Sequence, residues 1–375
     1  MSSPFLTKIT EAGVSIWLDD LSRERFETES TGSLQHLIRN RNIVGVTTNP
    51  AIFSQGITRS NLYNADLARY AKEGISAAEA IRRLTLSDVR RAAELFHSIH
   101  SDSDGVDGRI SIEVDPELAR ASEATIAEGA ELWQELNLPN ILIKVPATIE
   151  GLVAIEELTR MGISVNVTLI FTAKRYDQVM DAYFNGLERR LAAGESIADI
   201  HSVASFFISR IDTEIDARLQ SAVAPDLYPL LRGRAGVANA LLAYERFATR
   251  IDSERWRKLV GHGARMQRPL WASTGVKDSA YPATLYVESL ITAHSVNTMP
   301  EATLEAAAKL PSSLVIENVT AHSPRIDEAK SHLSTLMELG IDIDLVGGQL
   351  EEEGLEKFVT PWRSLHQKID ERLGS

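Results

Sequence analysis

The stretch ILIKVPA, residues 141–147, decides the fold that this sequence predicts. Its apolar residues are interrupted only by Lys144, and a helix-like segment follows at 151–161. Short apolar runs that lead into an amphipathic helix are typical of buried strands in a parallel sheet. The stretch therefore predicts one strand–helix unit, and similar units recur along the chain.

Further runs of the same character are separated by helix-like segments. The runs are 14–20, 43–49, 109–115, 163–171, 200–209, 268–274 and, as the weakest, 295–299. The clearest helical segments are 87–100, 116–136 and 173–193. This alternation predicts an α/β fold with helices outside a parallel sheet, and eight units favour a closed (β/α)8 TIM barrel. An open doubly wound sheet remains an alternative, because periodicity does not reveal closure.

Two segments exceed the minimal barrel. Residues 212–262 are helical in pattern, with a break at Pro225 and Pro229, and are read as an insertion between the sixth and seventh strands. The stretch 301–375 is also helical, with late helices at 351–358 and 361–373 that could pack across the barrel mouth. We expect one barrel domain over residues 1–375, with its core at about 14–300.

The composition excludes several classes of function. The 39 basic and 52 acidic residues give a net charge of −13, which argues against nonspecific binding to nucleic acid or anionic membranes. A local cationic pocket for a small phosphorylated substrate remains compatible with this charge. The chain has no cysteine, so disulfides and thiolate chemistry are excluded. Because no apolar stretch reaches membrane-spanning length and the N-terminus lacks a signal-like apolar region, we expect a cytoplasmic protein.

The strands carry polar residues on one face. Side chains alternate along a strand, and the inner face of a barrel strand leads to the active site at the C-terminal end. In the fifth strand, Val165, Val167 and Leu169 are expected to face the helices. The residues expected to point inward are Ser15, Trp17, Asp19, Gly45, Thr47, Asn49, Ser111, Glu113, Leu142, Lys144, Ser164, Asn166 and Thr168.

Lys144 is the sharpest chemical signal in these strands. Burial lowers the pKa of an amine, and a neutral amine attacks a ketone carbonyl. The alternative is a lysine that extends from the strand end to solvent. Glu113 and Asp19 are candidate general acid/base groups. Asp115 fits a helix cap better, while Asp20 stays open as an alternative to Asp19.

Further polar residues suit a polyhydroxylated, phosphorylated substrate. Asn166 and Thr168 offer fixed hydrogen-bonding groups, whereas Asn49, which precedes a proline, also fits a turn. Arg210 and Lys277 follow the sixth and seventh strands, where barrels often hold phosphate, although each would also be explained by pairing with a nearby aspartate. Ser205 and Ser273 are donors close to these cations. No motif for a metal, dinucleotide or nucleoside triphosphate is present, so no metal and no cofactor are expected.

Together these segments resemble the transaldolase family. The segments are WLD at 17–19, GVTTNP at 45–50, SIEVD at 111–115, IKVPAT at 143–148 and NVTLIF at 166–171, with looser similarity at 205–212, 270–278 and 296–300. They occur in the order of the family, and the length is similar to that of its longer bacterial subgroup. The resemblance implies a class I aldolase-type TIM barrel that works without a cofactor.

The resemblance also implies residue roles. Lys144 would form a Schiff base with the substrate ketone, and Glu113 would act through a water held by Thr168. Asp19 would take the proton of the C4 hydroxyl as the C3–C4 bond breaks. Contacts with the substrate would come from Asn49 and Asn166 to the dihydroxyacetone portion, from Ser205 to a hydroxyl, and from Arg210 to the phosphate.

One departure concerns the second phosphate contact. Many relatives carry an arginine two residues after the serine that Ser273 matches, and here Gly275 stands at that position. Lys277 is expected to supply the charge instead.

The expected activity is transfer of a dihydroxyacetone unit from sedoheptulose 7-phosphate to glyceraldehyde 3-phosphate, in the non-oxidative pentose phosphate pathway. A fructose-6-phosphate aldolase that releases free dihydroxyacetone is the nearest alternative; a noncatalytic sugar-phosphate-binding barrel and an acidic interaction scaffold are weaker ones. We expect sugar phosphates as partners, no nucleic acid and no membrane, and the sequence is compatible with a homo-oligomer.

Overall fold

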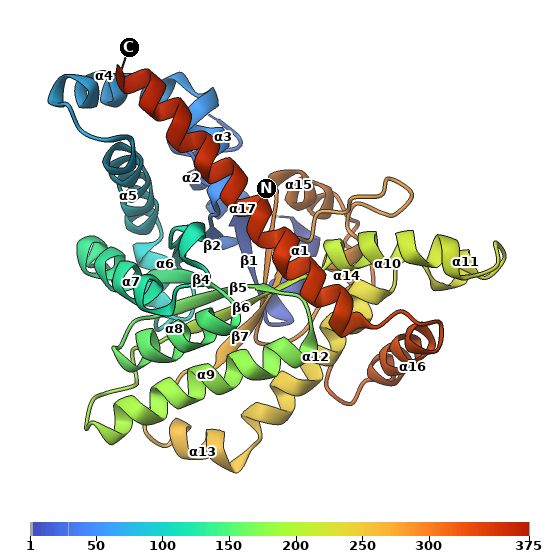
Figure 1. Cartoon of the computed structure of the whole chain (residues 1–375). Helices are drawn as coiled ribbons and strands as arrows, with labels where there is room; N and C mark the ends of the chain where they lie inside the picture. The colour runs from blue at the N-terminus through green and yellow to red at the C-terminus, as the bar shows by residue number, and fades with distance from the viewer. Residues whose placement is uncertain (1–2, 29, 375) are drawn as a thin grey trace.

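A computed structural model describes residues 3–28 and 30–374 and shows eight parallel strands closed into a barrel in the order β1 to β8 (Figure 1). The strands are β1 Val14–Asp19, β2 Ile43–Thr47, β3 Arg109–Glu113, β4 Ile141–Pro146, β5 Val165–Ile170, β6 Ser202–Phe207, β7 Gln267–Ala272 and β8 Ser295–Met299. Each lies within or at the edge of a run predicted from the sequence. The closed TIM barrel is therefore confirmed, and the open sheet is excluded.

The helices follow the strands and form the outer layer. They are α1 Pro4–Glu11, α2 Leu34–Arg41, α3 Pro50–Arg59, α4 Asn64–Glu73, α5 Ala77–Leu95, α6 His97–Asp102, α7 Ser122–Leu136, α8 Ile149–Arg160, α9 Ala173–Ala192, α10 Ser209–Ala222, α11 Tyr228–Leu231, α12 Ala235–Ile251, α13 Glu254–Val260, α14 Leu285–Ser289, α15 Glu301–Ala308, α16 Pro324–Glu338 and α17 Ile343–Gly374. Short 3-10 helices are η1 Arg23–Phe26, η2 Asn61–Tyr63 and η3 Pro116–Leu118.

The two faces of the strands separate as the alternation predicts, except at Val44, which packs against the inner cluster, and at Leu169. Ile110 and Ile143 pack in the core between strands and helices, while Trp17 and Leu142 belong to a second cluster inside the barrel. Leu169 also belongs to the inner cluster, so its predicted helix-facing position is wrong. Its φ of 59° breaks the alternation of β5, and the register of β5 against β6 shifts at the same place.

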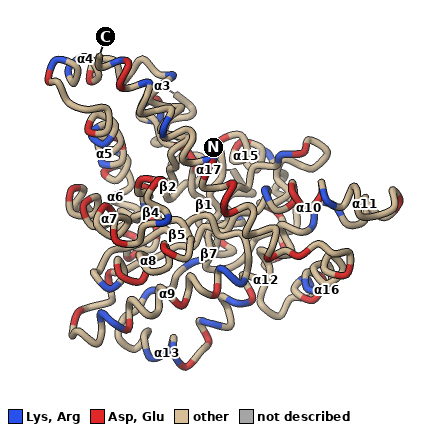
Figure 2. Tube along the Cα trace, viewed as in Figure 1, with Lys and Arg blue, Asp and Glu red and all other residues tan. Residues whose placement is uncertain are grey.

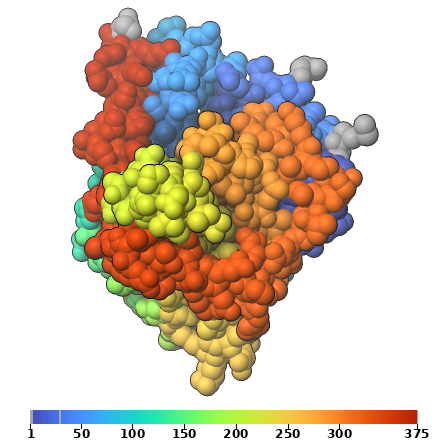
Figure 3. Space-filling model, turned by 90° about the vertical axis from the view of Figure 1, so that its right-hand side faces the viewer, coloured from blue at the N-terminus to red at the C-terminus, as the bar shows by residue number. Residues whose placement is uncertain are grey.

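Four helices, α10 to α13, lie between β6 and β7, where the insertion was predicted. One of them, α12, packs against α9 and β7 and so continues the outer layer of the barrel. The break expected at Pro225 and Pro229 falls between α10 and α12, where only the short α11 forms. A surface hollow of about 540 Å³ opens between this break and α16, visible between the yellow-green and red-orange segments of Figure 3.

The C-terminal segment forms one long helix, α17, where the sequence suggested two. Pro361 lies inside it and removes one backbone N–H, which normally breaks a helix. Burial of Phe358 and Leu365 on either side of the proline holds both halves to the barrel and offsets this loss. Figure 1 shows α17 in red, running across the strands from α16 to α4.

Charged residues of both signs are spread over the outer helices (Figure 2). Among the helices of residues 3–28 and 30–374, none is long and apolar enough to cross a membrane.

Candidate active site

The side chain of Lys144 lines a small cavity at the C-terminal end of the barrel. The residue is 4% exposed, and its Nζ donates to the carbonyl oxygen of Thr48 at 2.8 Å. The same nitrogen lies 3.2 Å from Oε2 of Glu113 and 5.6 Å from the centre of the Phe358 ring. The cavity, of about 160 Å³, brings this amine together with side chains from most of the strands. Lys144 is therefore buried and paired, and does not extend to solvent.

Glu113 is the acidic partner of Lys144 in this ion pair. Burial raises the pKa of its carboxyl to about 7, and the positive charge of Lys144 opposes that rise. Neither carboxylate oxygen has a hydrogen-bond partner among the described residues. Such a carboxyl can accept or release a proton near neutral pH, as a general acid/base requires.

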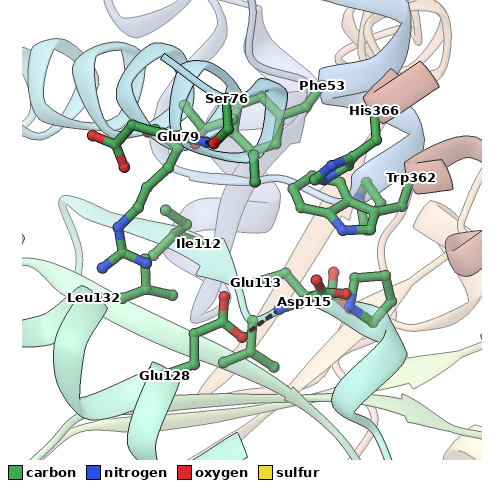
Figure 4. A pocket seen from close by; sticks show the side chains of 16 residues that line it. Phe53, Ser76, Glu79, Ile112, Glu113, Asp115, Glu128, Leu132, Trp362 and His366 are labelled. Carbon is green, nitrogen blue, oxygen red and sulfur yellow. Dashed lines mark hydrogen bonds between the residues drawn. The ribbon is translucent and has the colours of Figure 1, made fainter. Parts of the chain in front are cut away.

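A second cavity, of about 310 Å³, lies behind Glu113 between α5, α7 and α17. Figure 4 shows Glu128 approaching from one side and Trp362 and His366 from the other. Oε2 of Glu128 accepts from the backbone N–H of Asp115 at 2.8 Å, and burial raises the pKa of Glu128 to about 7. The sequence analysis did not identify Glu128, because its helix position resembles those of the exposed acids around it.

Asp19 lines the cavity that holds the Lys144 amine, whereas Asp20 does not. Asp19 accepts a hydrogen bond from the hydroxyl of Thr47 at 2.8 Å, and burial raises its pKa against the opposing charge of Lys144. Asp20 forms an ion pair with Arg25. Of the two carboxylates, only that of Asp19 therefore reaches the cavity of Lys144.

Thr168 points its hydroxyl into the cavity. Its Oγ1 is buried and has no hydrogen-bond partner within the described chain. A buried hydroxyl of this kind normally binds water or ligand, because an unpaired polar group is costly. The neighbouring left-handed Leu169 is strained, and such strain clusters at functional sites.

The two asparagines are held differently from one another. Nδ2 of Asn166 donates to Ser111 Oγ at 2.9 Å, and its Oδ1 accepts from Ser205 Oγ at 2.7 Å. Asn166 does not line the catalytic cavity, whereas Ser205 and Asn49 do. Oδ1 of Asn49 caps α3 by accepting from Ile52 N at 3.0 Å, so the turn interpretation holds for this oxygen and Nδ2 is left for a ligand.

Two cations face the cavity from the loops after β6 and β7. Nη1 of Arg210 is buried and has no partner within residues 3–28 and 30–374. Burial lowers the pKa of Arg210. Lys277 lines the same cavity and forms no ion pair with any described residue. The nearby aspartates are engaged elsewhere: Asp212 accepts from Gly236 N at 2.7 Å, and Asp278 pairs with Arg232 at 2.5 Å.

The remaining wall combines predicted and unpredicted residues. Ser273, with φ of 55°, shares a hydrogen bond of 2.9 Å with Ser209. Gly275 lies beside it in the lining, as does Phe358 of α17. The sequence did not predict that Phe358 lines this cavity, because Phe358 lies about 200 residues from Lys144 and no local pattern links the two. Within the described residues, no group of three or more histidine or acidic side chains could hold a metal ion.

The fold and this site define an α/β-barrel enzyme whose cavity holds a buried amine, the Asp19 carboxyl and two cations without ion-pair partners among the described residues, with the Glu113 carboxyl 3.2 Å from the amine. The family described as Transaldolase/Fructose-6-phosphate aldolase matches residues 16–369. Proteins named transaldolase are similar over nearly the full length: 46% identical in Thermobifida fusca, covering 100% of both chains, and 48% in Mycolicibacterium smegmatis, covering 97% of this chain and 96% of the relative. The Mycobacterium bovis transaldolase is 49% identical over 99% of this chain and 98% of its own.

The chain belongs to the transaldolase/fructose-6-phosphate aldolase family. Full-length similarity to transaldolases shows the activity within that family: the enzyme is a transferase of the transaldolase type, which acts on sugar phosphates.

Proposed function

We propose that the enzyme moves a dihydroxyacetone unit from sedoheptulose 7-phosphate to glyceraldehyde 3-phosphate through a Schiff base on Lys144. The products are erythrose 4-phosphate and fructose 6-phosphate, as in the non-oxidative pentose phosphate pathway. The observation that carries the proposal is the buried Lys144 amine, 3.2 Å from the Glu113 carboxyl. The cytoplasmic location and a homo-oligomeric state stay predictions.

The first step is attack of the Lys144 amine on the ketone carbon. The ammonium must first lose a proton, and Glu113, with a pKa raised to about 7, is placed to accept it. The carbinolamine then loses water, with its hydroxyl protonated from Glu113 through a water bound at the free Thr168 hydroxyl. Protonated imine formation turns the substrate C2 into an electron sink.

The second step breaks the C3–C4 bond. Asp19, in the cavity wall and hydrogen-bonded to Thr47, takes the proton of the C4 hydroxyl. The electron pair of the C3–C4 bond moves toward the imine, which leaves an enamine on Lys144 and releases erythrose 4-phosphate. The enamine attacks the aldehyde carbon of glyceraldehyde 3-phosphate, Asp19 returns its proton, and hydrolysis of the imine frees fructose 6-phosphate.

The remaining side chains hold the substrate. Nη1 of Arg210 is buried and has no hydrogen-bond partner in the described part of the chain, which suits a phosphate dianion, and Lys277 is the second cation that lines the same cavity. Ser205 and the free Nδ2 of Asn49 offer hydrogen bonds to sugar hydroxyls. Asn166 does not line the cavity and would act indirectly, because the two ends of its side-chain amide hydrogen-bond to Ser111 and Ser205 and hold these serines in place.

Borohydride trapping with fructose 6-phosphate tests the proposal. The adduct should map to Lys144 by peptide mass spectrometry and disappear in Lys144→Ala. Lys277→Ala is the matched control: it removes the other lysine of the cavity, so the adduct should persist while the KM for sugar phosphates rises. Turnover should require erythrose 4-phosphate as acceptor.

The same experiment distinguishes the alternatives. Release of dihydroxyacetone without an acceptor would assign the chain to the aldolase side of the family. A folded protein that forms no adduct on Lys144 would overturn the Schiff-base mechanism.

A further inference from the structure

A cavity of about 470 Å³ lies at the opposite, N-terminal end of the barrel. Its lining comes from the beginnings of strands, such as Ser15 in β1, Arg109 in β3 and Ser202 in β6, and from Trp256 of α13. None of its lining residues is shared with the catalytic cavity. Between the two ends, the barrel is filled by buried apolar side chains, which are Trp17, Leu142, Val203, Leu270 and Val296. The lower cavity is therefore a separate space.

Arg109 is the exceptional residue of this cavity. It is 2% exposed, and its Nε and Nη1 donate to the carbonyl oxygens of Gly105 at 2.6 Å and Pro139 at 3.3 Å. Among the described residues, no carboxylate forms an ion pair with it, and its Nη2 donates no hydrogen bond. Burial lowers its pKa to about 9. The charge of Asp107 opposes this fall only in part. A buried guanidinium without an ion-pair partner is costly, and a bound anion would offset that cost.

His201 and Arg109 both line the cavity. Nε2 of His201 and Nη2 of Arg109 lie close to the same residue, Gly105, because a Cβ built there would be 3.0 Å and 3.2 Å from them. The imidazole has no hydrogen-bond partner in the described chain. Burial and the charges of Arg109 and Arg265 keep it neutral by lowering its pKa to about 2. It can therefore donate one N–H toward a ligand.

Two further arginines make the cavity cationic. Arg268 lies 3.1 Å from Asp107, the one carboxylate that lines the space within the described residues. Arg265 pairs at 2.6 Å with Asp104, which is 81% exposed and so is screened by solvent. Three guanidiniums thus face one lining carboxylate, in a protein whose net charge is −13. A local excess of positive charge attracts anions even in an acidic protein.

We propose that this cavity is a second ligand site, which binds a phosphate group at Arg109, His201 and Arg265. A tetrahedral dianion can accept several hydrogen bonds at once and suits guanidinium donors. The cavity exceeds the size of a phosphate ion, so a small phosphate monoester fits the same chemistry. Sequence reasoning missed the site, because residues 105, 109, 201 and 265 meet only after the barrel closes.

Isothermal titration in the Arg210→Gln background tests the proposal, because that substitution weakens phosphate binding in the catalytic cavity. Inorganic phosphate is titrated against the full chain at constant ionic strength, and glycerol 3-phosphate is titrated in a parallel series. Addition of Arg265→Gln should weaken binding at least about tenfold. Addition of Arg257→Gln is the matched control: it removes an exposed arginine of α13 that does not line the cavity, and should leave binding unchanged.

Each outcome bears on the site. Tighter binding of glycerol 3-phosphate than of phosphate would identify an organic ester as the ligand class, and equal binding would identify free phosphate; both support the site. Arg109→Met gives a second probe, with folding checked by circular dichroism. Absence of binding of either probe in the Arg210→Gln protein, or binding that neither Arg265→Gln nor Arg257→Gln changes, would overturn the proposal.

Discussion

Replacing Glu128 by glutamine should stabilise the enzyme at alkaline pH and much less at acidic pH. The pKa of Glu128 is raised from 4.5 to about 7 by burial beside the cavity of Figure 4. Between these values the folded state holds a proton that the unfolded state has released, so stability falls as the pH rises through this window. The neutral amide of glutamine avoids this loss, and its oxygen can still accept from Asp115 N.

The magnitude follows from the two pKa values. Linkage gives a cost of ionised Glu128 of about 1 kcal/mol at pH 5 and about 3 kcal/mol at pH 8, as upper bounds. Glu128→Gln should therefore gain about 2 kcal/mol more over the parent at pH 8 than at pH 5. The assay is urea unfolding at both pH values, at one protein concentration, followed by circular dichroism.

Glu131→Gln is the matched control on the same helix, α7. Its side chain is 69% exposed, so we expect a change within about 0.5 kcal/mol at either pH. Equal gains for Glu128→Gln at pH 5 and pH 8, or no gain at pH 8, would refute the reasoning. Either result would mean that water in the cavity solvates the carboxylate fully.

Three further perturbations probe α17 and the site. Gly347→Ala would place a Cβ 2.1 Å from Cγ2 of Thr172, whose hydroxyl caps α9, so the free energy of unfolding should fall by about 1–2 kcal/mol. Gly348→Ala, where a Cβ meets nothing within 4 Å, should raise it by about 0.5–1 kcal/mol. Equal effects of the two substitutions in denaturant unfolding would contradict this prediction. Phe358→Ala should cost about 3–5 kcal/mol and lower kcat/KM by opening the cavity, and unchanged kinetics would show that α17 does not seal the site. Ser205→Ala leaves a buried amide oxygen without its donor and should cost about 1–3 kcal/mol, a prediction that unaltered unfolding would disprove.

Most of the barrel could be predicted from the sequence, because the pattern of each strand–helix unit is local. Alternation in SIEVD and ILIKVPA placed Glu113 and Lys144 on one face, and the structure brings them to 3.2 Å. Leu169 departs from the pattern. Alternation assigns its side chain to the helix-facing side of β5, but its left-handed backbone turns the side chain into the barrel. Local periodicity does not reveal such a break, because the strain is held by contacts with α17 and the neighbouring strands.

Long-range contacts set the limits of sequence reasoning elsewhere. Pro361 predicted a helix boundary, but α17 continues through it because buried residues on both sides hold it to the barrel. Pairing with the neighbouring Asp278 was the alternative explanation for Lys277, and the structure pairs Asp278 with Arg232, which directly follows α11. A charged side chain takes the partner that folding brings near, which sequence spacing does not specify.

By itself, the sequence determined the barrel class, the eight strands and the inward-facing lysine and carboxyls, since these depend on periods of two and about 3.6 residues along the chain. Only the tertiary structure decided that Asp19 rather than Asp20 lines the cavity, that Phe358 lies in its wall, and that Arg109 is buried with no ion pair to any residue the structure describes. The physical reason is that burial, pKa shifts and ion pairing depend on which distant segments meet, and closure of the barrel brings those segments together.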